Sequence, residues 1–89
     1  MYSLFYAQSA RDDLKRLDHS VASRILRKLD FFIKQKNPLE FAKKLKNFNI
    51  GDYRFRVGDY RVIFDINSRG VIAVLMVLRI KHRKDVYDF

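Results

Sequence analysis

The clearest alternation of polar and apolar positions in this chain lies in residues 53–64, YRFRVGDYRVIF. Gly58-Asp59 is a two-residue turn of the kind that needs positive φ, and the residues on both sides of it alternate strictly. The pattern predicts a tight β-hairpin in which Arg56 lies opposite Arg61. Because side chains alternate between the two faces of a strand, one face is predicted to be apolar, with Tyr53, Phe55, Val57, Tyr60, Val62 and Phe64. The other face is predicted to be basic, with Arg54, Arg56 and Arg61.

Two helices are predicted before the hairpin, because apolar residues recur there at helical spacing. The first covers residues 10–17, and we expect Asp12 and Asp13 in its first turn, where the helix dipole favours negative charge. The second has its apolar positions between residues 21 and 33 and is expected to end near Lys36-Asn37, because Pro38 disfavours helical geometry in the residue before it.

The remaining pattern predicts strands. Residues 3–6 are expected to form a first strand, residues 44–48 a short edge strand, and residues 67–70 a turn. Residues 71–78 are almost continuously apolar, as expected for a central strand that is buried on both faces. The order β-α-α-β-β-β-β predicts an α+β fold for residues 1–89 as a single domain. Two helices pack on one face of a small antiparallel sheet, and the basic face stays open.

Composition narrows the class of partner. The 89 residues contain 19 Lys and Arg against 10 Asp and Glu, a net charge of +9 that points to nucleic acid or an acidic protein. There is no cysteine and there are only two histidines, so we expect no zinc site, no other metal and no cofactor. Neither a signal peptide nor a membrane-spanning segment is evident, which predicts a cytoplasmic protein without a membrane partner.

The basic face of the hairpin has the chemistry of a phosphate clamp. Two arginines that face each other across a ladder repel, and a fold tolerates such a pair when an anion belongs between them. Guanidinium groups bind phosphate oxygens through two hydrogen bonds and stay charged at any working pH. Arg54, Arg56 and Arg61 are therefore predicted to bind phosphate groups.

Two further groups of residues could assist such a clamp. The tail after the last strand contributes two cations and two proton-transfer groups: Lys81, Arg83, His82 and Tyr87. His82 suits proton transfer near neutral pH, whereas Tyr87 could instead stack on a base. Three lysines before the hairpin could contact a nucleic-acid backbone: Lys43, Lys44 and Lys46.

This set of side chains suits one reaction class. The chain has no glycine-rich phosphate loop, and its acidic residues are too scattered for a two-metal nuclease. RNA can be cleaved without a metal, because its own 2′-hydroxyl attacks the neighbouring phosphorus. The protein must orient that attack, neutralise the developing charge and move protons, and arginines with a histidine or tyrosine can do all three.

The hairpin sequence YRFRVGDYRVIF, the apolar strand and the later HRKDVY at residues 82–87 together resemble the RelE/ParE superfamily of toxins from toxin–antitoxin pairs. The resemblance covers essentially the whole chain. It implies a compact, microbial-RNase-like α+β fold. For the RelE branch it also implies metal-independent cleavage of mRNA in the ribosomal A site, with a small RelB-like antitoxin that covers the basic surface.

The resemblance also implies roles for individual residues. Arg61 and Arg83 would stabilise the scissile phosphate, and Tyr87 would stack on a base or transfer a proton. Arg54 and Arg56 would be the cations of the hairpin, and Lys81 and His82 are secondary candidates. Some RelE-type enzymes carry lysines in place of these two hairpin arginines. Since arginine does not serve as a base, proton transfer would fall to His82 or Tyr87.

Two alternative functions remain open on the sequence. A ParE-like toxin would share this fold and act by binding and inhibiting DNA gyrase. A third possibility is a basic protein that binds an antitoxin or nucleic acid without catalysis. Retention of Arg61 together with the segment from His82 to Tyr87 favours the ribosome-dependent endoribonuclease.

Overall fold

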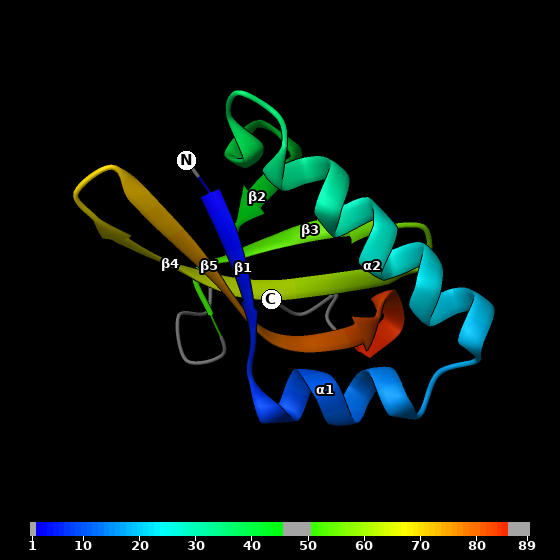
Figure 1. Cartoon of the computed structure of the whole chain (residues 1–89). Coiled ribbons are helices and arrows are strands. Elements are labelled where there is room, and N and C mark those ends of the chain that lie inside the picture. The colour runs from blue at the N-terminus through cyan, green and yellow to red at the C-terminus, as the bar shows by residue number, and fades with distance from the viewer. Residues whose placement is uncertain (1, 46–50, 86–89) are drawn as a thin grey trace.

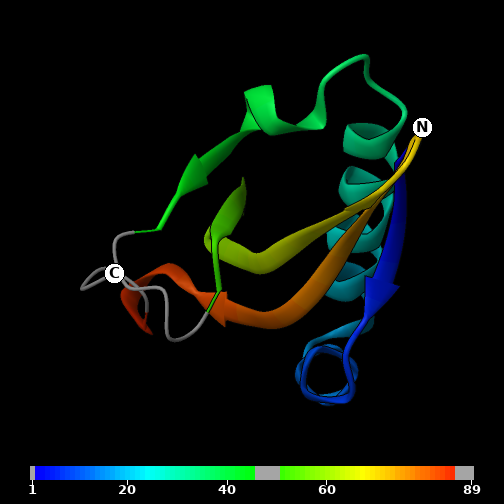
Figure 2. The same ribbon diagram turned by 90° about the vertical axis from the view of Figure 1, so that its left-hand side faces the viewer.

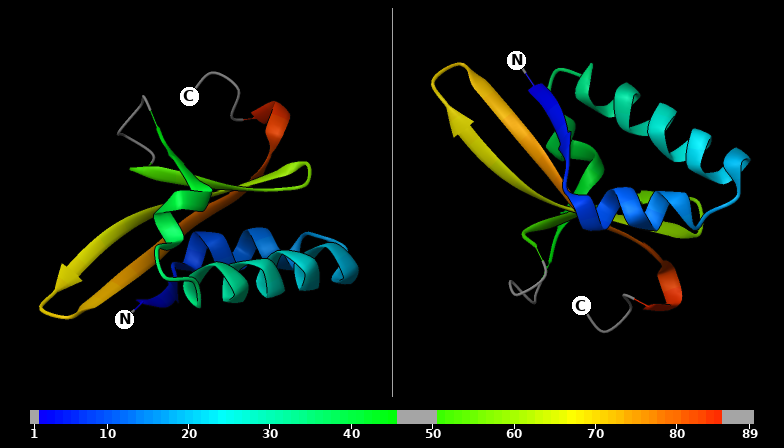
Figure 3. Two further views of the ribbon diagram at one scale, coloured as in Figure 1. Left: turned by 90° about the horizontal axis from the view of Figure 1, so that it is seen from above. Right: turned by 60° about the horizontal axis from the view of Figure 1, so that its bottom comes forward.

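The computed structural model describes residues 2–45 and 51–85. Its elements follow the predicted order: β1 (Tyr2–Tyr6), α1 (Gln8–Lys15), α2 (His19–Ile33), η1 (Pro38–Phe41), β2 (Ala42–Lys44), β3 (Tyr53–Val57), β4 (Tyr60–Arg69), β5 (Ile72–His82) and η2 (Arg83–Asp85). Both α-helices lie on one side of the sheet and η2 lies on the other (Figures 1 and 3). The α+β class and the two-layer arrangement are confirmed. No helix in the described part of the chain is long and apolar enough to cross a membrane.

The five strands form one sheet in the order β1-β5-β4-β3-β2. Strands β2 to β5 pair antiparallel, as predicted, but β1 pairs parallel with β5, from Tyr2 beside Ala73 to Tyr6 beside Val77. The expectation of a purely antiparallel sheet was therefore wrong for β1. A parallel pair needs a long connection, and here the helices and three strands lie between its two members.

The β3–β4 hairpin has the predicted turn and register. Val57 pairs with Tyr60, and Arg56 pairs with Arg61. Gly58 has a φ of +58° and Asp59 has no positive φ, so the glycine alone takes the left-handed conformation that the turn requires.

The core lies between this hairpin and the helices. Ala10 of α1 and Ile25, Leu29 and Phe32 of α2 pack against the apolar face of the sheet. The ring of Phe32 stacks on that of Phe55 at a centroid distance of 4.5 Å, and Phe55 stacks on Phe64 at 4.4 Å. The sheet is strongly twisted and curves around α2 (Figure 2).

Strand β5 is longer than the sequence predicted and contains an irregularity. It runs from Ile72 to His82 instead of ending at residue 78, and the turn before it is at Gly70-Val71 instead of at residues 67–70. The register with β4 shifts, since Ile63 pairs with Arg79 but Phe64 pairs with Val77. This bulge changes which side chains face the core in the last part of β5.

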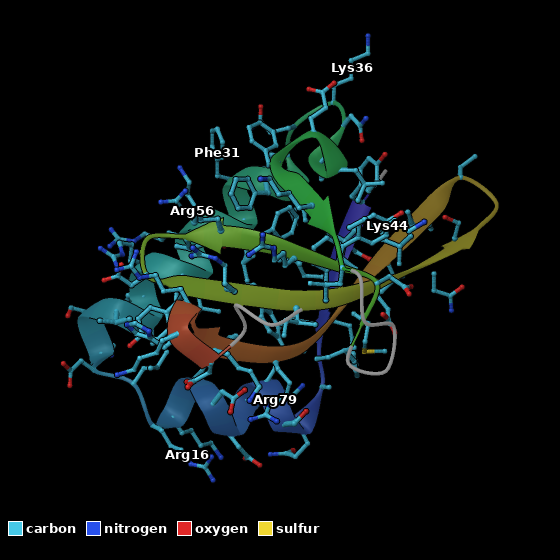
Figure 4. All side chains as sticks on the ribbon, turned by 180° about the vertical axis from the view of Figure 1, so that it is seen from behind. Arg16, Phe31, Lys36, Lys44, Arg56 and Arg79 are labelled. Atoms are coloured by element: carbon cyan, nitrogen blue, oxygen red, sulfur yellow. The ribbon has the colours of Figure 1, made fainter. Side chains whose placement is uncertain are left out.

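Helix α1 is anchored to β5 by polar contacts that the sequence did not predict. The Ser9 hydroxyl donates to the Leu78 carbonyl at 2.7 Å. Asp12 and Asp13 lie beyond the first turn, and the Asp13 carboxylate instead accepts from Arg79 Nε at 2.8 Å and from the Ile80 N–H at 2.9 Å. Arg79 lies beside α1 (Figure 4). The pairing joins groups 66 residues apart.

Removing the Asp13 charge is expected to destabilise the fold. Burial raises the pKa of Asp13, but the hydrogen bonds from Arg79 and Ile80 and the charges of Arg79 and Lys81 outweigh it, so the pKa is lowered from 3.8. Asp13→Asn should cost about 1.5–3 kcal/mol of unfolding free energy, because it weakens charge-assisted hydrogen bonds to a buried group.

Urea unfolding against pH tests this expectation. Because the folded-state pKa is depressed, the contribution of Asp13 is complete above its unfolded value of 3.8 and disappears as pH falls through the folded value. The gap between the wild type and Asp13→Asn should therefore narrow below pH 3.8. Asp12→Asn is the matched control, since Asp12 accepts from exposed Gln8. Equal losses of unfolding free energy in Asp13→Asn and Asp12→Asn would contradict the prediction.

The sheet face away from the helices is only partly open, which corrects the sequence expectation. Ile63 on that face is completely buried. Gly51 lies against it so closely that a Cβ on Gly51 would be 2.5 Å from Ile63 Cγ2. The Asp52 N–H, which donates to Asp65 at 2.8 Å, helps to fix this segment over the sheet. Around the three hairpin arginines, this face is open as a pocket.

Candidate active site

The cations on the sheet face away from the helices lie in two rows that cross the sheet. Directly paired residues share a face, so Arg56, Arg61 and Lys81 form one row across β3, β4 and β5. Lys43 and Arg54 lie side by side in the next row, on β2 and β3. Figure 4 looks onto this face, with Arg56 beside the β3–β4 hairpin.

The bulge in β5 places Lys81 in this arrangement. With an uninterrupted register, Lys81 would share the core face with Leu75 and Val77, because all three have odd numbers. The extra residue reverses the alternation, so Ile80 becomes a core residue that is 4% exposed and Lys81 pairs with Arg61. The bulge thus adds a cation to the arginine face and keeps an apolar residue in the core.

A pocket of about 260 Å³ opens among these cations. It is lined by Phe41, Lys43, Arg54, Arg56 and Arg61. Within residues 2–45 and 51–85, no ion pair involves any of the three arginines. As far as the described residues go, the pocket therefore presents a concentrated positive charge without an ion-paired carboxylate, which is the electrostatic requirement for an anion site.

Arg61 is the most firmly held cation of the pocket. Its side chain is buried, with 8% exposure, and Nη1 donates to the carbonyl oxygens of Gly58 and Tyr60, both at 3.0 Å. These bonds fix the guanidinium plane and use one of its nitrogens. In the described part of the chain, Nε and Nη2 have no hydrogen bond, and this is the edge that binds a phosphate through two parallel bonds.

The electrostatic environment of Arg61 is that of a crowded cation cluster. Burial lowers the pKa of Arg61 from its ordinary value, and the charges of Arg56, Arg54 and Arg83 lower it further. Asp59 is the acidic residue that acts in the opposite direction. The guanidinium still stays protonated, so the repulsion is relieved best by an anion between these side chains.

Arg83 approaches this cluster from η2. Its N–H donates to the Asp59 carbonyl in the hairpin turn at 2.7 Å. Its Nε is 3.7 Å from the Asp59 carboxylate, and both side chains are well exposed. The structure thus brings this tail residue to the hairpin turn, and the backbone bond fixes the start of η2.

Lys81 and His82 line a second cavity of about 260 Å³, which the sequence did not predict. This cavity lies between α1 and the end of β5 and is also lined by Arg16, Tyr60 and Arg79, among others. The His82 ring meets the Tyr60 ring edge-on at 5.3 Å, and its Nδ1 accepts from the Lys84 N–H at 3.3 Å. The structure thus places His82 at the neighbouring cavity and not in the wall of the arginine pocket.

The remaining candidates have separate positions. Lys43 lines the arginine pocket, whereas Lys44 pairs with Tyr53, a residue that packs against the core, and so belongs to the other face. Figure 4 shows Lys44 apart from Arg56. Tyr87 and Lys46 lie outside the described residues, and their roles stay predictions.

Two residues of the site were missed in the sequence. Phe41 lines the pocket from η1 with 44% of its surface exposed. Arg24 of α2 lies at the hairpin turn, with Nη2 3.1 Å from where a Cβ on Gly58 would be. Neither position follows from local pattern, because both depend on how α2 and η1 pack on the sheet. A helical arginine ordinarily lies on a solvated helix face.

Gly58→Ala is expected to disturb the site as well as the fold. An alanine at φ +58° costs about 1–2 kcal/mol, and a shifted turn would move the carbonyl that holds Arg61. Gly70→Ala is the matched control, because Gly70 has a φ of +60° and open space around it. Chemical denaturation should show comparable losses for both variants, and only Gly58→Ala should lower activity. A fully active Gly58→Ala protein would contradict the role assigned to the turn.

Comparison with known proteins agrees with this fold. Residues 4–87 match the family described as the ParE toxin of type II toxin–antitoxin system, parDE. The chain therefore belongs to this family, within the RelE/ParE superfamily of toxins.

Individual relatives lie in the same superfamily. The chain is 28% identical over 86 residues to Toxin RelG of Mycobacterium tuberculosis, covering 97% of this chain and 95% of that protein. The toxin–antitoxin complex RelBE2 from Mycobacterium tuberculosis contains a chain that superposes with a TM-score of 0.69 at 26% identity, covering 92% of this chain and 98% of that one. For the archaeal RelE–RelB complex from Pyrococcus horikoshii, the TM-score is 0.65 at 27% identity, with coverages of 92% and 94%.

Proposed function

We propose that this toxin is a metal-independent endoribonuclease that cleaves mRNA on the ribosome, in the cytoplasm. The observation that carries the proposal is the fixed, buried Arg61 guanidinium, which feels the charges of Arg54, Arg56 and Arg83 and keeps one edge for an anion. Arginines that served only as solvated surface charges would not include one that is buried near other arginines, since both burial and like charge cost free energy.

The proposed reaction uses the substrate's own nucleophile. The ribose 2′-oxygen attacks the adjacent phosphorus and loses its proton to a base, while the bond from phosphorus to the 5′-oxygen breaks and that oxygen gains a proton. The products are a 2′,3′-cyclic phosphate and a 5′-hydroxyl end. Negative charge accumulates on the phosphate oxygens during this step, and Arg61 and Arg83 would stabilise it.

The arginine pocket supplies charge and orientation but no base. His82 and Tyr87 are the proposed proton-transfer groups, and Tyr87 could stack on a base instead. His82 lies one position beyond Lys81, which is the β5 partner of Arg61. His82 itself pairs with Tyr60, so its ring points to the other face of the sheet from Arg61, and substrate held by the arginines would reach the imidazole only around the end of β5. Lys43 lies in the pocket wall, where it would contact the RNA backbone, whereas Lys44 and Lys46 are more peripheral proposals.

The experiment is cleavage of a defined mRNA in a reconstituted translation system. New mRNA 5′ ends within the A-site codon should appear with the wild type, and they should be lost with Arg61→Ala. No new ends with a folded wild-type protein would refute the proposal. The same preparation should be tested in a gyrase supercoiling assay.

That second assay addresses a ParE-like gyrase inhibitor, the alternative function. The family description favours it by name, because the matched family is the ParE toxin. Inhibition of supercoiling without mRNA cleavage would establish it. Loss of both activities would leave the third possibility, a basic protein that binds an antitoxin or nucleic acid without catalysis.

The proposed protein partner is a RelB-like antitoxin. Solved relatives from Mycobacterium tuberculosis, Methanococcus jannaschii and Pyrococcus horikoshii are toxin–antitoxin complexes. A net charge of +9 gives this chain a strong attraction for an acidic partner that covers the arginine pocket.

A further inference from the structure

We infer that Phe41 forms a stacking platform for a nucleobase next to the cleaved phosphate. The inference rests on the proposed function and adds a binding subsite to it. Phe41 is the aromatic member of a pocket whose other lining residues are all Lys or Arg. One nucleotide has both groups that such a pocket would bind, a phosphate for the cations and a flat base for the ring.

The ring of Phe41 is held in place by a series of aromatic contacts. It stacks on Phe32 at a centroid distance of 5.1 Å and meets Phe31 edge-on at 6.1 Å. Phe32 in turn stacks on Phe55, which stacks on Phe64 inside the core. The platform is therefore rigid before any ligand binds, which reduces the entropy lost on stacking.

Phe41 is partly exposed although its ring is packed on Phe32. Phe32 occupies one face of the ring, and 44% of Phe41 is still exposed. Pro38 at the start of η1 is buried, and the Asn37 side chain accepts from the Leu39 N–H at 3.2 Å, so the short η1 segment is fixed at its start. A large apolar side chain on a fixed turn, exposed beside cations, is typical of a binding position.

The charges favour RNA over an apolar protein segment as the occupant. A hydrophobic side chain stacked on Phe41 would bury Arg54 and Arg56 without neutralising them, which is unfavourable. A nucleotide places its phosphate toward these arginines and its base toward the ring. The pocket volume of about 260 Å³ suits one such unit.

Phe41→Leu is the test variant, and Phe31→Leu is its matched control. Phe31 is exposed to a similar extent, 47%, and belongs to the same aromatic series, but it does not line the pocket. Leucine keeps apolar packing and removes the ring face, so the two variants should lose similar stability in urea. Phe41→Tyr keeps a ring face and should behave as the wild type.

The readout is the half-saturating concentration of ribosomes programmed with a defined mRNA in single-turnover cleavage. Phe41→Leu should raise it by about 5- to 150-fold, the loss expected for one stacked base. The mRNA is then made with single abasic sites flanking the cleaved bond. At one of these positions, the abasic site should raise the half-saturating concentration for the wild type by a similar factor and leave that for Phe41→Leu unchanged.

The outcomes separate this inference from the proposed function. Absence of cleavage by the wild type refutes both. Normal cleavage by the wild type with equal behaviour of the Phe41→Leu and Phe31→Leu proteins refutes the platform alone. A Phe41→Leu protein that cleaves normally but binds its antitoxin more weakly would assign the ring to a protein contact and overturn the inference.

Discussion

Arg61→Ala is expected to lower the rate of mRNA cleavage by about 10²- to 10³-fold, the loss typical of one donor that stabilises a developing anion. Its Nη1 donates to the Gly58 and Tyr60 carbonyls, so the Nε–Nη2 edge is oriented before the substrate binds. Arg61→Lys keeps the charge but loses the planar contact through two hydrogen bonds. Its cleavage rate should lie between those of the alanine variant and the wild type.

Stability should change little in Arg61→Ala. Two hydrogen bonds to carbonyls are lost, and the repulsion by Arg56, Arg54 and Arg83 is relieved. These terms oppose each other, so we expect a change of less than about 1.5 kcal/mol in urea unfolding. Arg27→Ala on the exposed side of α2 is the control and should be active. An Arg61→Ala protein that unfolds would show that the arginine has a structural role. One that cleaves mRNA normally would show that it has no role in cleavage.

Arg83→Ala is expected to lower cleavage by about 10²-fold or more without loss of stability. Its side chain is exposed and makes one long ion pair, 3.7 Å, with an exposed carboxylate, and such pairs contribute little to folding. The backbone bond from its N–H to Asp59 remains in the variant, so η2 should keep its place.

Lys84→Ala provides the control for Arg83→Ala. The two cations are neighbours in η2 and both are exposed, but of the two only Arg83 is among the charges that lower the pKa of Arg61. Single-turnover rates on programmed ribosomes should separate them. Equal effects of the two substitutions would mean that η2 contributes only general positive charge.

The hairpin could be predicted in detail because its determinants are local. A glycine-containing turn between alternating segments fixes the pairing, so the register of Arg56 with Arg61 follows from sequence. The pairing of β1 with β5 could not be predicted in this way. It joins residues about 70 positions apart, and short apolar strands carry little information about which neighbour they choose.

The bulge in β5 could not be predicted from the sequence pattern either. A run of apolar residues has no visible alternation, so the change of face between Val77 and Ile80 leaves no sign in the sequence. This single irregularity decides that Lys81 joins the arginine row. It also extends the strand to His82, beyond the end expected at residue 78.

The residues of the site could be predicted only where they follow from strand alternation. The three hairpin arginines share a face because alternation requires it, and the structure places them around one pocket. Phe41 and Arg24 enter that region through the packing of η1 and α2, which no local motif specifies. His82 was predicted to assist the arginines, but its ring lines the second cavity and not the arginine pocket.

The most direct test of the central claim, RNA cleavage by the 2′-hydroxyl with arginine stabilisation, replaces one ribose in the mRNA. A single 2′-deoxynucleotide at the cleaved position removes the nucleophile and leaves the phosphate and base unchanged. We expect that this mRNA, bound to programmed ribosomes, is not cut there, while unmodified mRNA gives a 2′,3′-cyclic phosphate end. Continued cleavage of the deoxy-substituted mRNA, with a free 3′-hydroxyl end, would rule out the 2′-hydroxyl as the nucleophile.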